Sequence, residues 1–160
     1  DIRWMSGANW EKSRALTRLK KDFLREFFAR SQGFFLTGGS ALGIFYLDHR
    51  HSHDLDFFSL SEVNWQILHT IVLDIGNILG AEIEVVQHSE YMVRYLISRG
   101  QDTEVVDLVR ELTPQVATEK MEFEGMIVDS LEEIVVNKWC TVLGRAEIKD
   151  IIDLYFASKS

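Results

Sequence analysis

The sequence has almost no cysteine or proline, and it lacks a long apolar segment. Its one cysteine, Cys140, cannot form an intramolecular disulfide, which is typical of proteins in the reducing cytosol. A single proline and ten glycines leave little room for a disordered linker. No apolar run approaches the roughly 18 residues of a membrane span, and no secretory leader is recognisable. We therefore expect a cytoplasmic protein that does not associate with membranes.

Positive charge is also scarce. The sequence has 17 Lys and Arg residues but 25 Asp and Glu residues. The resulting net charge of −8 argues against a protein that coats nucleic acid. The charge does not exclude a local basic surface. We predict a helix from Asn9, its N-cap, to Arg30, and this segment is rich in lysine and arginine. That face is either simply solvated or a docking surface for RNA or an acidic partner.

One stretch, FFLTGGSALGIFYLDHRHSHDLDFFS from Phe34 to Ser59, combines glycines and aspartates. An apolar strand ends at the Gly-Gly-Ser turn of Gly38, Gly39 and Ser40, and a short helix follows. Such a turn offers backbone N–H groups and a hydroxyl to a phosphate. Asp54 and Asp56 then lie on one face of a second strand, because they are two residues apart. Adjacent carboxylates require a cation, and Mg²⁺ prefers oxygen ligands and bridges to substrate phosphates.

The loop between this helix and the second strand is rich in histidine. His49, His51 and His53 raise the question of a zinc site. We do not favour one, because no cysteine and no regular ligand spacing accompany them.

Farther along, Asp107 interrupts an apolar strand that runs from Thr103 to Arg110. A carboxylate in such a strand is costly unless it is paired or binds an ion. It either ligates a metal or forms a salt bridge to a basic residue such as Arg94. The elements that we predict after Pro114 are a strand from Met121 to Val128 with a bulge at Gly125, and helices from Leu131 to Leu143 and from Ala146 to Ala157.

The GGS and DLD motifs at this spacing resemble the nucleotidyltransferase fold superfamily, whose signature is GG or GS, a helix and a DxD strand. Within it, GGSAL followed by RHSHDLDF is most similar to the AbiEii/AbiGii toxins. The tail NKWCTVLGRAEIKDIIDLYF matches a second motif of that family: a lysine, an arginine, and then K/R-D-x-x-D-L-Y. The resemblance covers roughly Phe34 to Tyr155. The matching tail residues are Lys138, Arg145, Lys149, Asp150, Asp153, Leu154 and Tyr155.

The resemblance implies a metal centre with an NTP substrate. Asp54 and Asp56 would hold two Mg²⁺ ions, with Mn²⁺ as an alternative, and Asp107 would complete the second metal site. The residues expected to bind the nucleotide are Gly38, Gly39, Ser40, Arg50 and Lys138.

Arg50 and Asp150, which the resemblance also places in the site, each have an equally good structural interpretation. Arg50 would either lie near the triphosphate or order its loop through a salt bridge. Asp150 would act as an acid or base, or else Asp150 and Asp153 would anchor the last helix to Arg145 or Lys149.

Together, the residues and the resemblance predict an α/β (α+β) nucleotidyltransferase fold with a mixed, mostly antiparallel sheet and packed helices. We expect one domain with a helical segment (1–33), a sheet core (34–128) and C-terminal helices (129–160). The expected function is transfer of a nucleoside monophosphate from an NTP to an acceptor with release of pyrophosphate. By resemblance, the protein would be the toxin of a toxin–antitoxin or phage-defence pair, with a cognate antitoxin and with tRNA, another RNA or a protein as acceptor.

Two other classes of function stay open. One is a nucleotidyltransferase for a small molecule such as an aminoglycoside, which an acidic cleft wall beside the nucleotide would favour. The other is a non-catalytic module that binds NTP or an antitoxin.

Overall fold

A seven-stranded mixed sheet organises the computed structural model, which describes residues 7–48, 54–116, 118–144 and 148–159. The strand order is β3-β4-β5-β2-β1-β7-β6. β2 is parallel to β5 and β1 to β7, whereas the other neighbouring strands are antiparallel, as predicted. The strands are β1 (Phe34–Thr37), β2 (Asp54–Ser59), β3 (Glu82–His88), β4 (Met92–Arg99), β5 (Asp102–Arg110), β6 (Met121–Phe123) and β7 (Met126–Val128).

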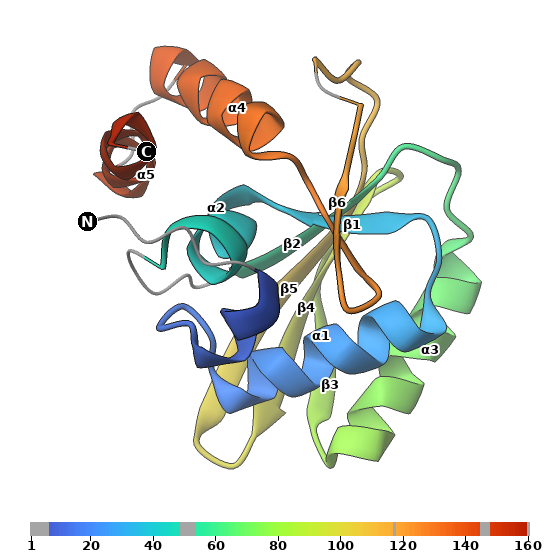
Figure 1. Ribbon diagram of the computed structural model, residues 1–160. Helices are drawn as coiled ribbons and strands as arrows, with labels where there is room; N and C mark the ends of the chain where they lie inside the picture. Colours follow the sequence, from blue (N-terminus) through green and yellow to red (C-terminus); the bar gives the residue numbers. More distant parts are fainter. Residues whose placement is uncertain (1–6, 49–53, 117, 145–147, 160) are drawn as a thin grey trace.

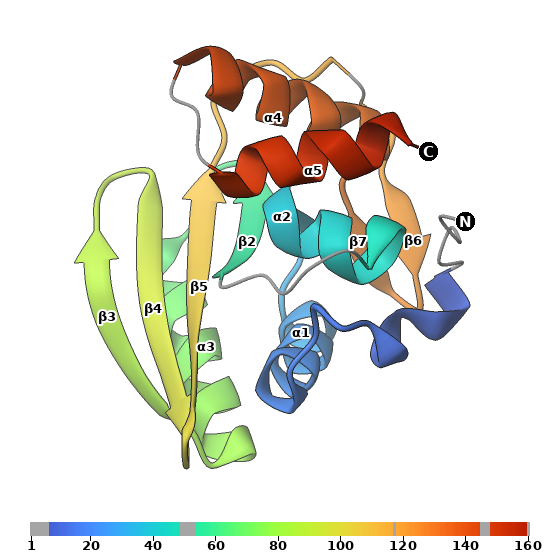
Figure 2. The ribbon, with the colours of Figure 1, turned by 90° about the vertical axis from the view of Figure 1, so that its left-hand side faces the viewer.

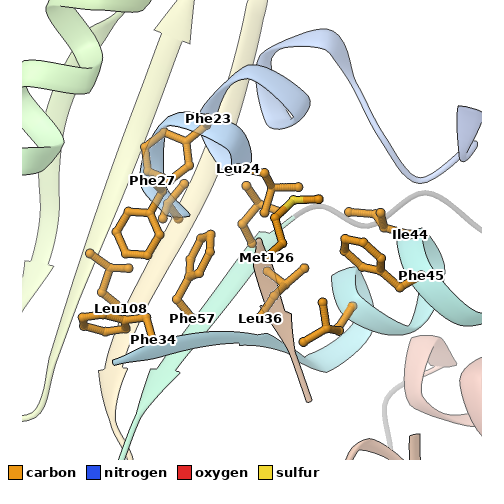
Figure 3. Close-up of a cluster of buried hydrophobic side chains, with 14 of the residues drawn as sticks. Phe23, Leu24, Phe27, Phe34, Leu36, Ile44, Phe45, Phe57, Leu108 and Met126 are labelled. Carbon is orange, nitrogen blue, oxygen red and sulfur yellow. The ribbon is translucent and has the colours of Figure 1, made fainter. Parts of the chain in front are cut away.

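One face of the sheet is covered by α1 (Arg18–Arg30) and α3 (Trp65–Leu79) (Figure 1). An aromatic cluster joins α1 to the sheet, and the rings of Phe27 and Phe57 lie 4.4 Å apart between centroids (Figure 3). Leu55 and Phe57 are fully buried there. Because side chains alternate along a strand, burying these two residues turns Asp54 and Asp56 to the opposite face.

The helices near that opposite face are α2 (Gly38–Ala41), its π-helical continuation η2 (Leu42–Leu47), α4 (Leu131–Gly144) and α5 (Ile148–Ser158). α4 and α5 pack against each other and against η2 (Figure 2). The hydroxyl of Ser130 accepts the N–H of Glu133 (3.1 Å) and so caps the start of α4. None of the helices in the described ranges is both long and apolar enough to cross a membrane.

The N-terminal helix is shorter than predicted. A 3₁₀ segment, η1 (Gly7–Lys12), contains Asn9, and α1 begins only after Thr17, whose hydroxyl accepts the N–H of Lys20. The interruption has a tertiary cause. The buried Ser13 hydroxyl bonds to Asp48 (3.0 Å) and also accepts the N–H of Ala15, and such bonds compete with helical ones.

The segment from Met121 to Val128 was predicted as one strand with a bulge, and this is wrong. It forms the hairpin β6–β7, in which Glu124 and Gly125 both have positive φ (52° and 82°). Two consecutive residues with positive φ form the tight turn that suits the twist of a hairpin. Gly125 therefore reverses the chain.

Candidate functional site

Strand register brings the predicted aspartates together. Thr37 of β1, Asp56 of β2, Asp107 of β5 and Arg94 of β4 are successive Cα partners across four strands. Partners in register point to the same face of a sheet, so this row places two carboxylates and a guanidinium side by side. Asp54 lies on the same face, two residues before Asp56.

Asp107 forms the salt bridge to Arg94 that was the alternative to metal binding. Arg94 donates from Nε to Oδ1 (2.7 Å) and from Nη2 to Oδ2 (2.9 Å), and Asp107 is only 6% exposed. This hydrogen bonding raises the pKa of Arg94 above its ordinary value, and the charges of Asp54 and Asp56 act in the same direction. In the part of the chain that the structure describes, no three His, Cys, Asp or Glu side chains are arranged to hold a metal ion.

The glycine turn closes directly over the aspartate row. Gly38 has φ +71°, and a Cβ atom there would lie 2.6 Å from Oδ2 of Asp56. Gly39 and Ser40 are buried in α2. The hydroxyl of Thr37, the residue before the turn, donates to the buried Asp129 (2.9 Å). Only glycine fits at position 38, because of both its backbone conformation and this close approach.

On the helical side, Lys138 lies between two buried carboxylates. Its Nζ is 2.6 Å from Oδ1 of Asp150 and 3.1 Å from Oδ2 of Asp153. The two aspartates therefore anchor α5 to Lys138 of α4. Arg145 and the side chain of Lys149, which were the predicted partners, lie outside the described residues.

The second oxygen of Asp150 has a different environment from the first. Oδ2 is buried and has no hydrogen-bond partner among the residues that the structure describes. A buried oxygen without a partner costs free energy unless a ligand or water satisfies it.

A pocket of about 480 Å³ lies between these two groups. It brings together five of the predicted site residues and does not include Asp54, Gly39 or Ser40 in its wall. Arg50 and the three loop histidines lie outside the described residues. The predicted residues that line the pocket are Gly38, Asp56, Asp107, Lys138 and Asp150.

Several pocket residues were not predicted. Thr37 and Glu111 come from the sheet side, and Asn137 and Thr141 come from α4. The α4 residues had a signal in the sequence, because Ile134, Asn137, Lys138 and Thr141 follow the i, i+3, i+4, i+7 spacing of one helix face. Glu111 follows the last residue of β5 and had no such signal.

Comparison with known proteins identifies the family. A model of the nucleotidyl transferase AbiEii toxin family, described as belonging to a type IV toxin–antitoxin system, matches residues 22–160. The chain belongs to this family. The family predicted by resemblance is thereby confirmed. No curated protein sequence matches the chain significantly.

Solved structures similar to this AbiEii-family chain include JHP933 from Helicobacter pylori, with a TM-score of 0.68, 21% identity, and coverage of 96% of this chain and 66% of that chain. A second structure from H. pylori, described as a putative nucleotidyltransferase, has a TM-score of 0.66 and 23% identity, with coverage of 96% of this chain and 68% of that chain. MenT4, a nucleotidyltransferase toxin from Mycobacterium tuberculosis, has a TM-score of 0.56 and 16% identity, with coverage of 98% of this chain and 65% of that chain. At these identities the likeness shows the fold alone, and the chain spans about two thirds of each neighbour's length.

Proposed function

We propose that this AbiEii-family protein transfers a nucleoside monophosphate from an NTP to an acceptor hydroxyl, as the toxin of a toxin–antitoxin pair. The observation that carries the proposal is the pocket, in which Gly38, Asp56 and Asp107 form one wall and Lys138 lies on another. A close backbone turn, carboxylates and a lysine are the parts that phosphoryl transfer needs for positioning and charge neutralisation.

Asp54 and Asp56 are the residues that would hold Mg²⁺. They offer carboxylate oxygens on one face of a strand, which suits a hard cation, and Asp56 lies directly under the Gly38 turn. When bound, the ion neutralises charge on the triphosphate and polarises the phosphoryl group.

The turn and Lys138 would bind the phosphates from two sides. An ammonium group has three N–H donors, and Asp150 and Asp153 take two of those of Lys138. The third donor is left for a phosphate oxygen. Because two buried aspartates fix the ammonium, it is held in place before the nucleotide arrives.

Asp150 would receive the proton of the acceptor hydroxyl. The acceptor oxygen forms a bond to the α-phosphorus, the bond from that phosphorus to pyrophosphate breaks, and the proton moves to the carboxylate of Asp150. Asp150 lines the pocket, and one of its two carboxylate oxygens, Oδ2, lacks a partner among the described residues. Lys138, bound to the other oxygen, keeps the carboxylate oriented.

As the AbiEii resemblance implies, we expect tRNA or another RNA, or else a protein, to be the acceptor. A small polycation such as an aminoglycoside is the second candidate, because Glu111 adds an acidic group to the pocket wall beside Asp56 and Asp107.

Incubation with each α-labelled NTP and Mg²⁺, together with either bacterial tRNA or an aminoglycoside, tests the proposal. We expect label on tRNA from a preferred NTP, and a loss of at least about 100-fold in Asp56→Ala. Asp74→Ala on the exposed side of α3 is the matched control and should keep full activity. Label on the aminoglycoside alone would favour the second candidate. The catalytic proposal would be wrong if no acceptor, protein included, became labelled.

A further inference from the structure

The salt bridge between Arg94 and Asp107 lies inside the proposed metal centre. β2, β5 and β4 are neighbours in the sheet (Figure 2), and Asp56, Asp107 and Arg94 face the same side in one row. Arg94 is therefore next to the carboxylate that the AbiEii resemblance assigns to a second metal ion.

Both oxygens of Asp107 are engaged. The two bonds from Arg94, of 2.7 and 2.9 Å, have the paired geometry in which a guanidinium binds a carboxylate most strongly. A metal ion that used Asp107 as a ligand would have to compete with these bonds. It would also lie beside a positive charge that is never lost, because arginine stays protonated in proteins.

We propose that Arg94 takes the place of the acceptor-side metal ion. Its guanidinium holds Asp107, and the protein binds a single divalent ion through Asp54 and Asp56. The inference rests on the proposed function and changes one part of it: the number of ions and the role of Asp107. A guanidinium cannot activate a hydroxyl by direct coordination, so a carboxylate must take the acceptor's proton, and Asp150 is placed to do so.

Counting bound Mn²⁺ tests this without using activity. The full chain is dialysed to equilibrium with Mn²⁺ and a non-hydrolysable α,β-methylene NTP, and the retained metal and nucleotide are measured. The wild type should retain one Mn²⁺ per nucleotide. Arg94→Met should retain two, because Asp107 becomes free to bind an ion and the repelling charge is gone.

Two further variants keep the result interpretable even if Arg94→Met folds poorly. Asp107→Asn should still retain one Mn²⁺ per nucleotide, because the side chain is not a ligand. Arg99→Met removes another arginine of β4 whose partner, Asp22 (2.9 Å), lies outside the pocket wall, and it should also retain one.

The possible failures are distinct. Two Mn²⁺ per nucleotide in the wild type would overturn this inference and leave the proposed function standing. A folded Arg94→Met protein that still retains one ion would do the same. Failure of the wild type to retain either metal or nucleotide would overturn the proposed function and this inference with it.

Discussion

The pocket lies between a sheet wall, whose Asp107 is bound by Arg94, and a helix wall, whose Lys138 is bound by Asp150 and Asp153. Both ion clusters combine a cation with carboxylates, but the cations differ in burial. On the sheet wall, Arg94 pairs with Asp107 and keeps 38% of its side chain exposed. On the helix wall, Lys138 keeps 13%, and Asp150 and Asp153 keep 3% and 0%. Removal of an ion from a buried cluster leaves charges without solvation, whereas an exposed partner is solvated by water.

The two walls also depend on their ion pairs to different degrees. The aspartates of the sheet wall are positioned by continuous strand pairing, which does not require their charges. α5 has no such ladder, and two of its large apolar side chains, Ile151 and Tyr155, are more than half exposed. We infer that the Lys138 cluster attaches α5 to α4, and that ion pairing stabilises the helix wall more than the sheet wall.

Lys138→Met should therefore have the largest effect on stability. It removes the cation that contacts the buried Asp150 and Asp153, which should lower the free energy of unfolding by about 3–5 kcal/mol. Urea denaturation followed by circular dichroism measures the loss, and hydrogen exchange should show α5 opening first. Adding Asp150→Asn and Asp153→Asn to Lys138→Met should recover much of it. A loss below about 1 kcal/mol would mean that the cluster does not hold the helix wall.

Gly38→Ala should have an intermediate effect, and Gly100→Ala provides a matched control. Both glycines have positive φ (+71° and +61°), so alanine costs roughly 1–2 kcal/mol at either position. Only at position 38 would the added Cβ meet Asp56, at 2.6 Å, whereas nothing lies within 4 Å at position 100. Gly38→Ala should cost about 1–3 kcal/mol more than its control, as overpacking does.

Calorimetry completes the comparison of the two glycines. Gly38→Ala should lose Mg²⁺-dependent NTP binding and Gly100→Ala should keep it. Equal stability and equal NTP affinity in the two variants would show that the Gly38 turn has no special relation to the carboxylate below it.

Local patterns in the sequence were sufficient to predict which carboxylates belong to the sheet wall, but not how these carboxylates are arranged relative to one another. The alternation in DLDF predicted that Asp54 and Asp56 share a face, because alternation is a property of one strand. Pairing of Asp56 with Asp107 depends on the register of two parallel strands far apart in the chain. Because this register cannot be read from the sequence, metal binding and a salt bridge to Arg94 were both possible roles for Asp107.

The helix wall was harder to predict because its contacts depend on how helices pack. Lys138 was expected to contact phosphates, and Asp150 was expected either to act as an acid or base or, with Asp153, to pair with Arg145 or Lys149, which are close in sequence. The structure pairs both aspartates with Lys138 across two helices, a contact that depends on helix packing, while Arg145 and the side chain of Lys149 lie outside the described residues. The start of α1 was mispredicted for a similar reason, because the bond between Ser13 and Asp48 is a tertiary contact.

Asp107→Asn should have the smallest effect on stability. Three nearby carboxylates repel, so removing one charge favours the metal-free protein, whereas weakening the bond to Arg94 disfavours it. Asparagine still accepts one of the two hydrogen bonds, and the guanidinium is exposed enough for water to replace the other. The net change should stay within about 1 kcal/mol, similar to an exposed pair and well below Lys138→Met. Urea denaturation of Asp107→Asn beside Asp22→Asn, which weakens the partly exposed pair with Arg99, measures it. A loss as large as that of Lys138→Met would mean that the Arg94 pair also supports the fold, and the sheet wall would then depend on its charges as the helix wall does.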